Sequence, residues 1–188
     1  MTNEQNHGRK IDEGTVSRPD DARHLLELYL QDHYAGSAGG VRLIERSRES
    51  NAGTAFEPGL ARLDDEIHHD QVELRKIMEH LAIEPSKLKE AIAWGAATLG
   101  GLKLNGRLTT YSPLSRVVEL EALTAAVSAK LCLWMTLGNL ADEEERVDKV
   151  TLTRLRDAAR AQLDRLAEMH RDATRIAFES APAQASGE

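Results

Sequence analysis

The sequence predicts an all-α protein built as a four-helix bundle. Aromatic residues make up only 4% of the 188 residues, Leu, Ala, Glu and Arg are abundant, and runs of β-branched residues are few. This composition is typical of helices rather than sheets. Four long segments also repeat their apolar residues at helical spacing. With 41% hydrophobic residues the chain can form a core, and its length favours a single domain.

We expect that domain to span residues 19–178, between two polar ends. Residues 1–18 are polar and mixed in charge, and residues 179–188 are small and polar. Such segments bury too little apolar surface to offset the entropy cost of ordering them. The sequence therefore predicts a flexible N-terminal segment over 1–18 and a disordered C-terminal tail over 179–188.

The first two long helices are predicted over residues 19–48 and 58–82. Pro19 stands at an early helical position, and acids follow it near the N-terminal end of the helix dipole. The sequence SNAGTAFE then forms a turn, and Pro58 opens the second helix. Pro85 is expected to end that helix, because proline lacks an N–H donor and disfavours helical angles in the residue before it.

The second half of the chain predicts one short helix and then two long ones. The segment KLKEAIAWGAATL can form a short helix that stops at Gly100 and Gly101. Ser112 then supplies a cap, and a proline follows it, for a helix over 113–138. The fourth helix is expected over 142–178, where neither Gly nor Pro occurs, either continuous or broken near Thr151.

The lengths of the connections predict how the helices are ordered in space. Short connections join the first helix to the second and the third to the fourth, which gives two antiparallel hairpins. About thirty residues separate the second helix from the third, and a helix of ~25 residues is ~37 Å long. We therefore expect a long, partly helical crossover that starts the third helix parallel to the second. In the alternative, the short helix packs as a fifth member of an ordinary bundle.

The charge balance and the chain ends limit the classes of partner. A net charge of -7, without a block of Lys or Arg, argues against nucleic acid. The polar N-terminus lacks the apolar core of a signal peptide, and the single cysteine, Cys132, cannot form an internal disulfide, so we expect a cytoplasmic protein. The apolar stretch 122–140 contains Lys130 and hydroxyl residues, which favours a buried helix, with Cys132 inside it, over a membrane span.

Residues 25–44, LLELYLQDHYAGSAGGVRLI, place an acid and an imidazole inside the first helix. At 3.6 residues per turn, the carboxylate of Asp32 is expected to point inward, in a stripe with Leu25, Leu28, Ala35, Gly39 and Leu43. A second register remains open, in which His33 faces inward together with Leu26, Ser37, Gly40 and Ile44.

Three glycines, Gly36, Gly39 and Gly40, follow in the same helix. Each costs about 1 kcal/mol relative to Ala in a helix interior. We expect the close approach of another helix to explain them, although the Gly36 to Gly40 spacing could also admit a ligand or a dimer partner.

The second helix presents two acids to the expected core. At 100° per residue, Asp70 lies within about 20° of the apolar stripe and Glu66 about 60° from it. His69 lies about 120° away, so Glu66 and His69 do not form a well-oriented Glu-x-x-His pair.

The third and fourth helices each add a polar group. On the third, Glu119 and Lys130 share one stripe and Glu121 lies on another, and one of the two stripes must face the bundle. On the fourth, His170 lies beside the apolar row, but position 167 is Ala and completes no Glu-x-x-His pair.

These inward groups are of the types that bind metal ions. The candidate ligands are Asp32, Glu66, Asp70, Glu119 and His170, with Glu121 as the alternative to Glu119. Iron or manganese bridged by carboxylates would explain why so many acids are buried. In the alternative, Lys130 and Arg116 neutralise the acids in a metal-free structural or protein-interaction bundle, and a small-ligand site is a third interpretation. No nucleophile–base pair and no phosphate loop is recognisable, so catalytic residues are not assigned.

The chain resembles the ferritin-like superfamily, and in particular a bacterial branch of it. The resemblance covers residues 20–178 and rests on the helix pattern and on QDHYAG at 31–36, EIHHD at 66–70, LKLNGRL at 102–108 and YSPLSRVVELE at 111–121. It implies a bundle with one crossover, often with a carboxylate-bridged di-iron site and an oxidase, hydroxylase or storage activity.

By position, the resemblance implies that Glu66 is the acid of the second helix, that Glu119 or Glu121 is the acid of the third, and that Asp32 stands where the first helix supplies Glu. The apolar surface of the third helix, with Trp134 and Met135, is expected to be covered by the crossover helix or by a second subunit in a homodimer.

Overall fold

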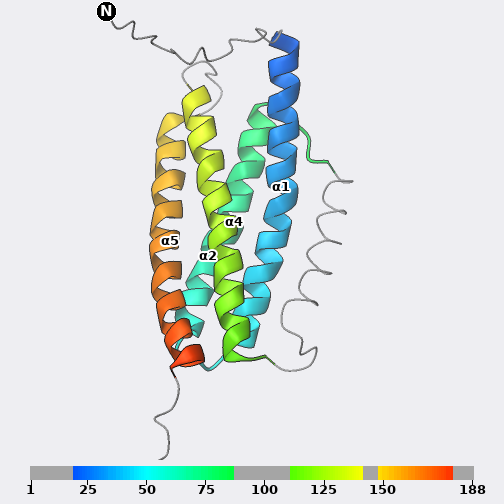
Figure 1. The fold of residues 1–188 in the computed structure, drawn as a ribbon. Coiled ribbons are helices and arrows are strands. Elements are labelled where there is room, and N and C mark those ends of the chain that lie inside the picture. Colours follow the sequence, from blue (N-terminus) through cyan, green and yellow to red (C-terminus); the bar gives the residue numbers. More distant parts are fainter. Residues whose placement is uncertain (1–18, 87–110, 142–147, 180–188) are drawn as a thin grey trace, which may run out of the picture.

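The computed structural model describes residues 19–86, 111–141 and 148–179, and their regular structure consists of four helices. These are α1 (Pro19–Ser50), α2 (Glu57–His80), α4 (Pro113–Leu140) and α5 (Lys149–Phe178), which form an elongated bundle (Figure 1). The prediction of an all-α, four-helix bundle is confirmed. The predicted short helix, the flexible first 18 residues and nearly all of the predicted tail lie outside the described residues.

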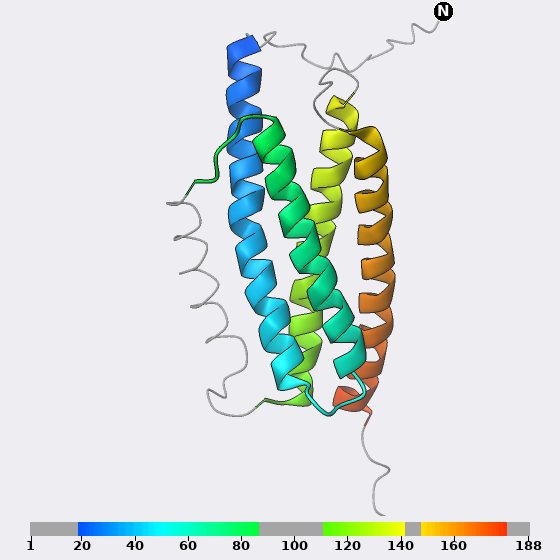
Figure 2. The same cartoon turned by 180° about the vertical axis from the view of Figure 1, so that it is seen from behind.

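Neighbouring helices in the bundle run in opposite directions. The chain colours in Figure 1 show that α1 and α5 run one way and α2 and α4 the other. α1 packs against α2 and α4, and α5 packs against the same two helices, as the view from behind also shows for α1 and α2 (Figure 2). α2 therefore ends at one end of the bundle and α4 begins at the other, parallel to α2, as the connection lengths predict.

Two of the helices begin at well-formed caps. Ser112 Oγ accepts a hydrogen bond from the backbone N–H of Ser115 (3.2 Å), and Ser115 Oγ accepts one from the N–H of Ser112 (3.3 Å). This reciprocal capping box, followed by Pro113, starts α4 where the sequence predicts. α5 is capped by Asp148, whose carboxylate accepts from two backbone N–H groups. Residues 142–147, where the fourth helix was expected to begin, lie outside the described residues.

α2 ends at His80, before Pro85, so the proline does not terminate it. Its last turn closes through a hydrogen bond from the backbone N–H of Ile83 to the carbonyl of Met78 (2.9 Å), while Ala82 adopts a left-handed conformation with φ 55°. This is the arrangement in which glycine usually terminates a helix. The predicted end near residue 82 is correct, but the residue that produces it is Ala82.

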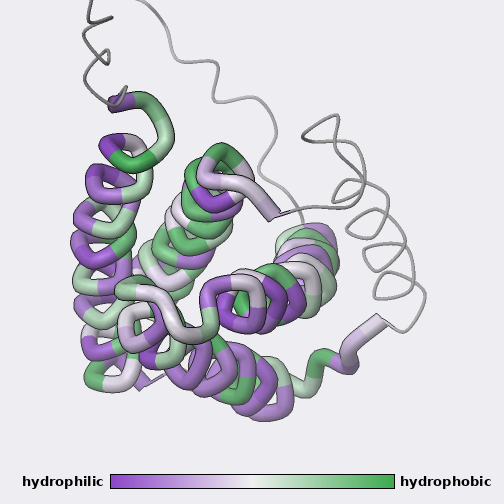
Figure 3. The backbone as a smooth tube through the Cα atoms, turned by 90° about the horizontal axis from the view of Figure 1, so that it is seen from below, coloured by the Kyte–Doolittle hydropathy of each residue, from purple (hydrophilic) through white to green (hydrophobic). Residues whose placement is uncertain are grey.

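The core lies along the axis of the bundle and is made of aliphatic side chains from all four helices. Figure 3 shows hydrophilic and hydrophobic residues along each of the four described helices. Trp134 is buried within the single chain, at 1% exposure, whereas Met135 is 45% exposed. The crossover helix that was expected to cover this surface lies outside the described residues, and a second subunit stays a prediction. The fully buried large side chains include Leu30, Ile44, Leu60, Leu63, Met78, Leu120, Leu123, Leu133, Leu137 and Leu155.

α4 is the most apolar helix of the described chain. It is long and apolar enough to cross a membrane by length and composition alone, a test that the core helix of a soluble protein also passes. In this structure α4 packs against α1 on one side and α5 on the other. Cys132, expected to be buried in it, is exposed.

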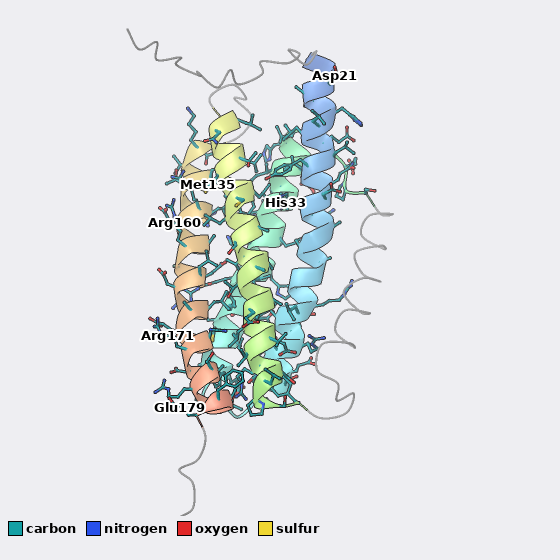
Figure 4. All side chains as sticks on the ribbon, viewed as in Figure 1. Asp21, His33, Met135, Arg160, Arg171 and Glu179 are labelled. Atoms are coloured by element: carbon teal, nitrogen blue, oxygen red, sulfur yellow. The ribbon has the colours of Figure 1, made fainter. Side chains whose placement is uncertain are left out.

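The inward face of α1 differs from the first predicted register. Asp32 is exposed, and Leu25 and Leu28 of the same stripe are 58% and 36% exposed. The buried positions are Leu30, Ala35, Ile44 and Ser47. The second register, with His33 on the inner side, is therefore the correct one, and Figure 4 shows His33 on the side of α1 that faces α4. Ala35, buried at the border of both stripes, is compatible with either register.

Candidate functional site

A closed triad of hydrogen bonds lies in the middle of the bundle. Lys130 Nζ donates to Asp70 Oδ2 at 2.5 Å and to Gln162 Oε1 at 2.6 Å, and Gln162 Nε2 donates to Asp70 Oδ2 at 3.0 Å. The three residues come from α4, α2 and α5, and Asp70 and Gln162 are 4% and 1% exposed. The predicted inward direction of Asp70 is confirmed.

The triad holds a positive and a negative charge close together in a region of low exposure. Burial lowers the pKa of the Lys130 ammonium, and the neighbouring charge of Asp70 opposes that effect. A buried carboxylate without a partner would be very costly, so Lys130 and Gln162 make the burial of Asp70 tolerable. The triad is therefore a built, charge-balanced element of the core.

A partly open cavity of about 380 Å³ lies next to the triad, between α1, α2 and α4. Asp70 and Lys130 form part of its wall, together with apolar side chains of α2 and α4 and small residues of α1. The apolar and small wall residues include Gly36, Gly40, Ile67, Leu74, Ala126, Val127, Ala129, Leu133 and Trp134. The cavity thus has an apolar body, a buried charged end at Asp70 and Lys130, and further polar residues on its α1 side.

Two glycines of α1, Gly36 and Gly40, lie on the cavity wall beside open space. A Cβ atom added at Gly36 or Gly40 would meet no atom within 4 Å among the described residues. Within the described residues, the expected close approach of another helix is therefore not found at Gly36 or Gly40. Small residues on α4, Ala126 and Ala129, stand on the cavity wall as well. Both helices thus present small residues to part of the cavity wall, although α4 also contributes Leu133 and Trp134.

Polar side chains surround the α1 side of the cavity. Gln71 Nε2 donates to Ser37 Oγ at 2.9 Å, and Ser37 Oγ donates to the carbonyl of Tyr34 at 2.6 Å, which joins α2 to α1. The His33 ring meets the Tyr29 ring edge-on, with centroids 4.6 Å apart. Burial lowers the pKa of His33, against the opposing charge of Asp32, so the imidazole favours its neutral form.

Glu119, one of the predicted ligands, lies in a separate network at the end of the bundle where α1 ends and α4 begins. Its carboxylate accepts hydrogen bonds from Arg46 Nε (3.1 Å), Ser47 Oγ (3.0 Å) and Tyr111 Oη (3.1 Å). Buried Asn51 joins the same network through Tyr111 Oη at 2.7 Å. Glu119 thus connects α1 to the start of α4 through these hydrogen bonds.

Arg116, expected to neutralise the core acids, serves this same network. Its Nε donates to Asn51 Oδ1 at 2.5 Å, and its guanidinium lies over the Phe56 ring, 4.4 Å from the centroid. The cation paired with Glu119 is Arg46.

The other predicted ligands are also paired outside the core. Glu66 forms ion pairs with Arg62 (3.0 Å) and with Arg165 of α5. His170 Nε2 lies 3.2 Å from Glu121 Oε1, and these two side chains are 36% and 59% exposed. The inward face of α4 therefore carries Glu119 and Lys130, and Glu121 points to solvent.

The described residues do not bring the predicted metal ligands together. Only Asp70 lies in the core; Asp32 is exposed on the cavity wall, and Glu66, Glu119 and His170 belong to three other networks. No group of three or more His, Cys, Asp or Glu side chains in the described ranges is placed to hold a metal ion. A lysine ammonium lies directly on Asp70, so the donor set does not fit a di-iron centre. Binding of iron or manganese stays a prediction.

No protein-family model, curated protein or solved structure matches the chain. Its function is therefore argued from its own geometry.

Gln162 and the cavity were not identified from the sequence. The signal for Gln162 was present, because it follows Leu155 and Ala159 and precedes Leu166 at helical spacing, a polar residue in an apolar row. Asp70 was identified by the same criterion. The cavity had a weaker signal, since the glycine spacing fits open space and close packing equally well.

Proposed function

We propose that this chain is a ferritin-like helical bundle that binds a small, largely apolar molecule in the cavity between α1, α2 and α4. The observation that carries the proposal is the cavity itself. It has a volume of about 380 Å³, and a buried, hydrogen-bonded ion pair forms part of its wall. Ligand sites in proteins are commonly concave, mostly apolar and 300–1,000 Å³ in size, with a few polar groups that orient the ligand. The cavity has these properties.

The ferritin-like assignment is supported by the arrangement of the helices. Two antiparallel pairs, α1 with α2 and α4 with α5, are combined so that α2 and α4 run parallel. Bundles with one long crossover connection have this arrangement.

A metal-free role is supported by the pairing of the core acid. Lys130 supplies the positive charge that a metal ion would otherwise supply to Asp70, and Gln162 accepts from the same ammonium. Elemental analysis of protein purified without chelator tests this part directly. Near-stoichiometric iron or manganese would contradict it.

Binding of a neutral apolar dye such as Nile red tests the cavity. Because Gly36 and Gly40 have open space beside them, Gly36→Leu together with Gly40→Leu should fill the cavity and reduce dye binding at least about tenfold while the protein remains folded. Circular dichroism checks the fold.

Gly138→Leu is the matched control for this experiment. Gly138 is also a helical glycine with no described atom within 4 Å of an added Cβ, but it does not line the cavity. Its dye affinity should stay at the wild-type value. Equal binding by all three proteins would show that the dye binds elsewhere and would contradict the proposal.

A further inference from the structure

The geometry points to an uncharged ligand, with an apolar body and one acceptor oxygen, an alcohol or a carbonyl, that receives a hydrogen bond from Lys130. This inference rests on the proposed function and specifies the chemical class that the cavity would select. It is argued from the hydrogen-bonding groups and the charges on the cavity wall.

The cavity wall carries more N–H donors than the hydrogen bonds within the protein use. An ammonium has three N–H donors, and the bonds from Lys130 to Asp70 and Gln162 use two of them. Trp134, also on the wall and 1% exposed, has a buried indole N–H without a hydrogen-bond partner in the described structure. An indole N–H can only donate, and leaving a buried donor unpaired is costly. A ligand oxygen in the cavity therefore complements the third N–H of Lys130, whereas the indole nitrogen of Trp134, with less than 1 Å² of accessible area, is closed off from it.

The charges on the wall disfavour an anionic ligand. The charged side chains that line the cavity are Asp32, Asp70 and Lys130, and the single cation is already paired with Asp70 at 2.5 Å. A ligand carboxylate would be desolvated beside Asp70 without a counter-ion of its own, and like charges at short range repel strongly where water is excluded. Burial also keeps the neighbouring His33 toward its neutral form, so it adds no compensating charge.

A cationic ligand is disfavoured for a different reason. A ligand ammonium can only donate, and it would meet the Lys130 ammonium in competition for the same Asp70 carboxylate. The exposed Asp32 lies in a region where solvent screens its attraction. An uncharged head group avoids both costs and keeps the triad intact.

The inference is tested with four compounds of equal chain length: decanol, decanoate, decylamine and decane. Trp134 reports binding, and a Trp94→Phe protein leaves it as the single tryptophan. Calorimetry gives independent dissociation constants. Decanol is expected to bind at least about tenfold tighter than each of the other three, the effect of one hydrogen bond to a charged donor.

The variant with Asp70→Leu and Lys130→Met removes the polar end of the cavity without leaving an unpaired charge. It should bind decanol and decane with similar affinity, while the Gly36→Leu, Gly40→Leu protein should bind neither. Tightest binding of decanoate or decylamine to the wild type would overturn the inference and leave the cavity function standing. Retained preference for decanol in the Asp70→Leu, Lys130→Met protein would also overturn it. Failure of all four compounds to bind would remove the proposed function itself.

Discussion

Lys130 Nζ and Asp70 Oδ2 lie 2.5 Å apart although their helices, α4 and α2, do not pack directly against each other in the described structure. The bond therefore crosses the centre of the bundle, and Gln162 of α5 closes it from a third side. A long lysine side chain can span this distance because its methylene stem packs among apolar groups while its ammonium reaches the carboxylate. This one element links three of the four described helices by hydrogen bonds.

Replacing Lys130 with Met should destabilise the protein by about 3–5 kcal/mol, because it leaves Asp70 charged and buried without its partner. Urea unfolding followed by circular dichroism measures the change. The control is the double variant Asp70→Leu, Lys130→Met, which removes both charges and should recover most of the loss. A loss under about 1 kcal/mol in the single variant would mean that Lys130 is free to reach solvent and that the pair contributes little.

Replacing Gly36 or Gly40 with Ala should stabilise the protein by up to about 1 kcal/mol each, since alanine is the better helix former and no described atom obstructs its methyl group. Thermal unfolding measures the gain. Gly59→Ala provides the comparison, because its Cβ would lie 2.9 Å from Met169 Sδ, and the sulfur would have to move. Destabilisation by Gly36→Ala or Gly40→Ala would show that the space beside α1 is occupied.

Replacing Ala82 with Gly should also stabilise the protein, in this case by about 1 kcal/mol, because a left-handed conformation costs an L-residue roughly that amount and costs glycine nothing. Chemical unfolding measures the change. Ala161→Gly, at an exposed position inside α5, is the control and should cost about 1 kcal/mol. The same substitution is thus expected to have opposite signs at the two positions. A loss of stability in Ala82→Gly would place the end of α2 elsewhere.

The sequence allowed the helices and their directions to be predicted because each signal was local or depended only on a length. Ser112 with Pro113 marked the start of α4, and the long second connection required α4 to run parallel to α2. Asp70 was placed correctly because the leucines of α2 form one narrow stripe, and a polar residue inside it stands out.

The register of α1 could not be predicted with the same reliability. Its apolar residues occur on more than one side of the helix, and Leu25 and Leu28 prove to be exposed. Glycine has no side chain, so Gly36 and Gly40 did not indicate which side of the helix faces the core. Asp32 was assigned inward for that reason, whereas the tertiary structure turns His33 toward α4.

For a related reason, the sequence could not predict which basic residue pairs with each acid. Ion pairs such as Glu119 with Arg46 depend on the relative height of two helices. Helical periodicity gives the face on which a side chain lies, but not its height against a neighbouring helix. The five candidate ligands could therefore share an inward direction in the sequence and still lie in separate networks.

Tyr111 should give the protein a stability component that disappears at high pH. Burial raises the pKa of its phenol to about 12, and the hydrogen bond to the Glu119 carboxylate acts in the same direction. The folded state therefore binds the phenolic proton more tightly than the unfolded state, whose pKa is about 10. The sign follows from linkage: the contribution is fully present below pH ~10 and is lost as the pH rises toward ~12. Because the ring is partly exposed, solvent screening should limit the loss to about 1 kcal/mol.

The measurement is the free energy of unfolding between pH ~9 and ~12 for the wild type and for Tyr111→Phe, a range set by the ordinary phenol pKa and the raised one. Lys130, whose pKa is lowered by burial, changes stability with the opposite sign as the pH rises, but it is present in both proteins and cancels in the difference. The difference between the two proteins should therefore shrink with rising pH, and the tyrosinate absorbance that develops toward pH ~12 should be smaller in Tyr111→Phe. A difference that stays constant across this range would mean that the phenol titrates alike in the folded and unfolded chain, which would contradict its burial in the folded protein.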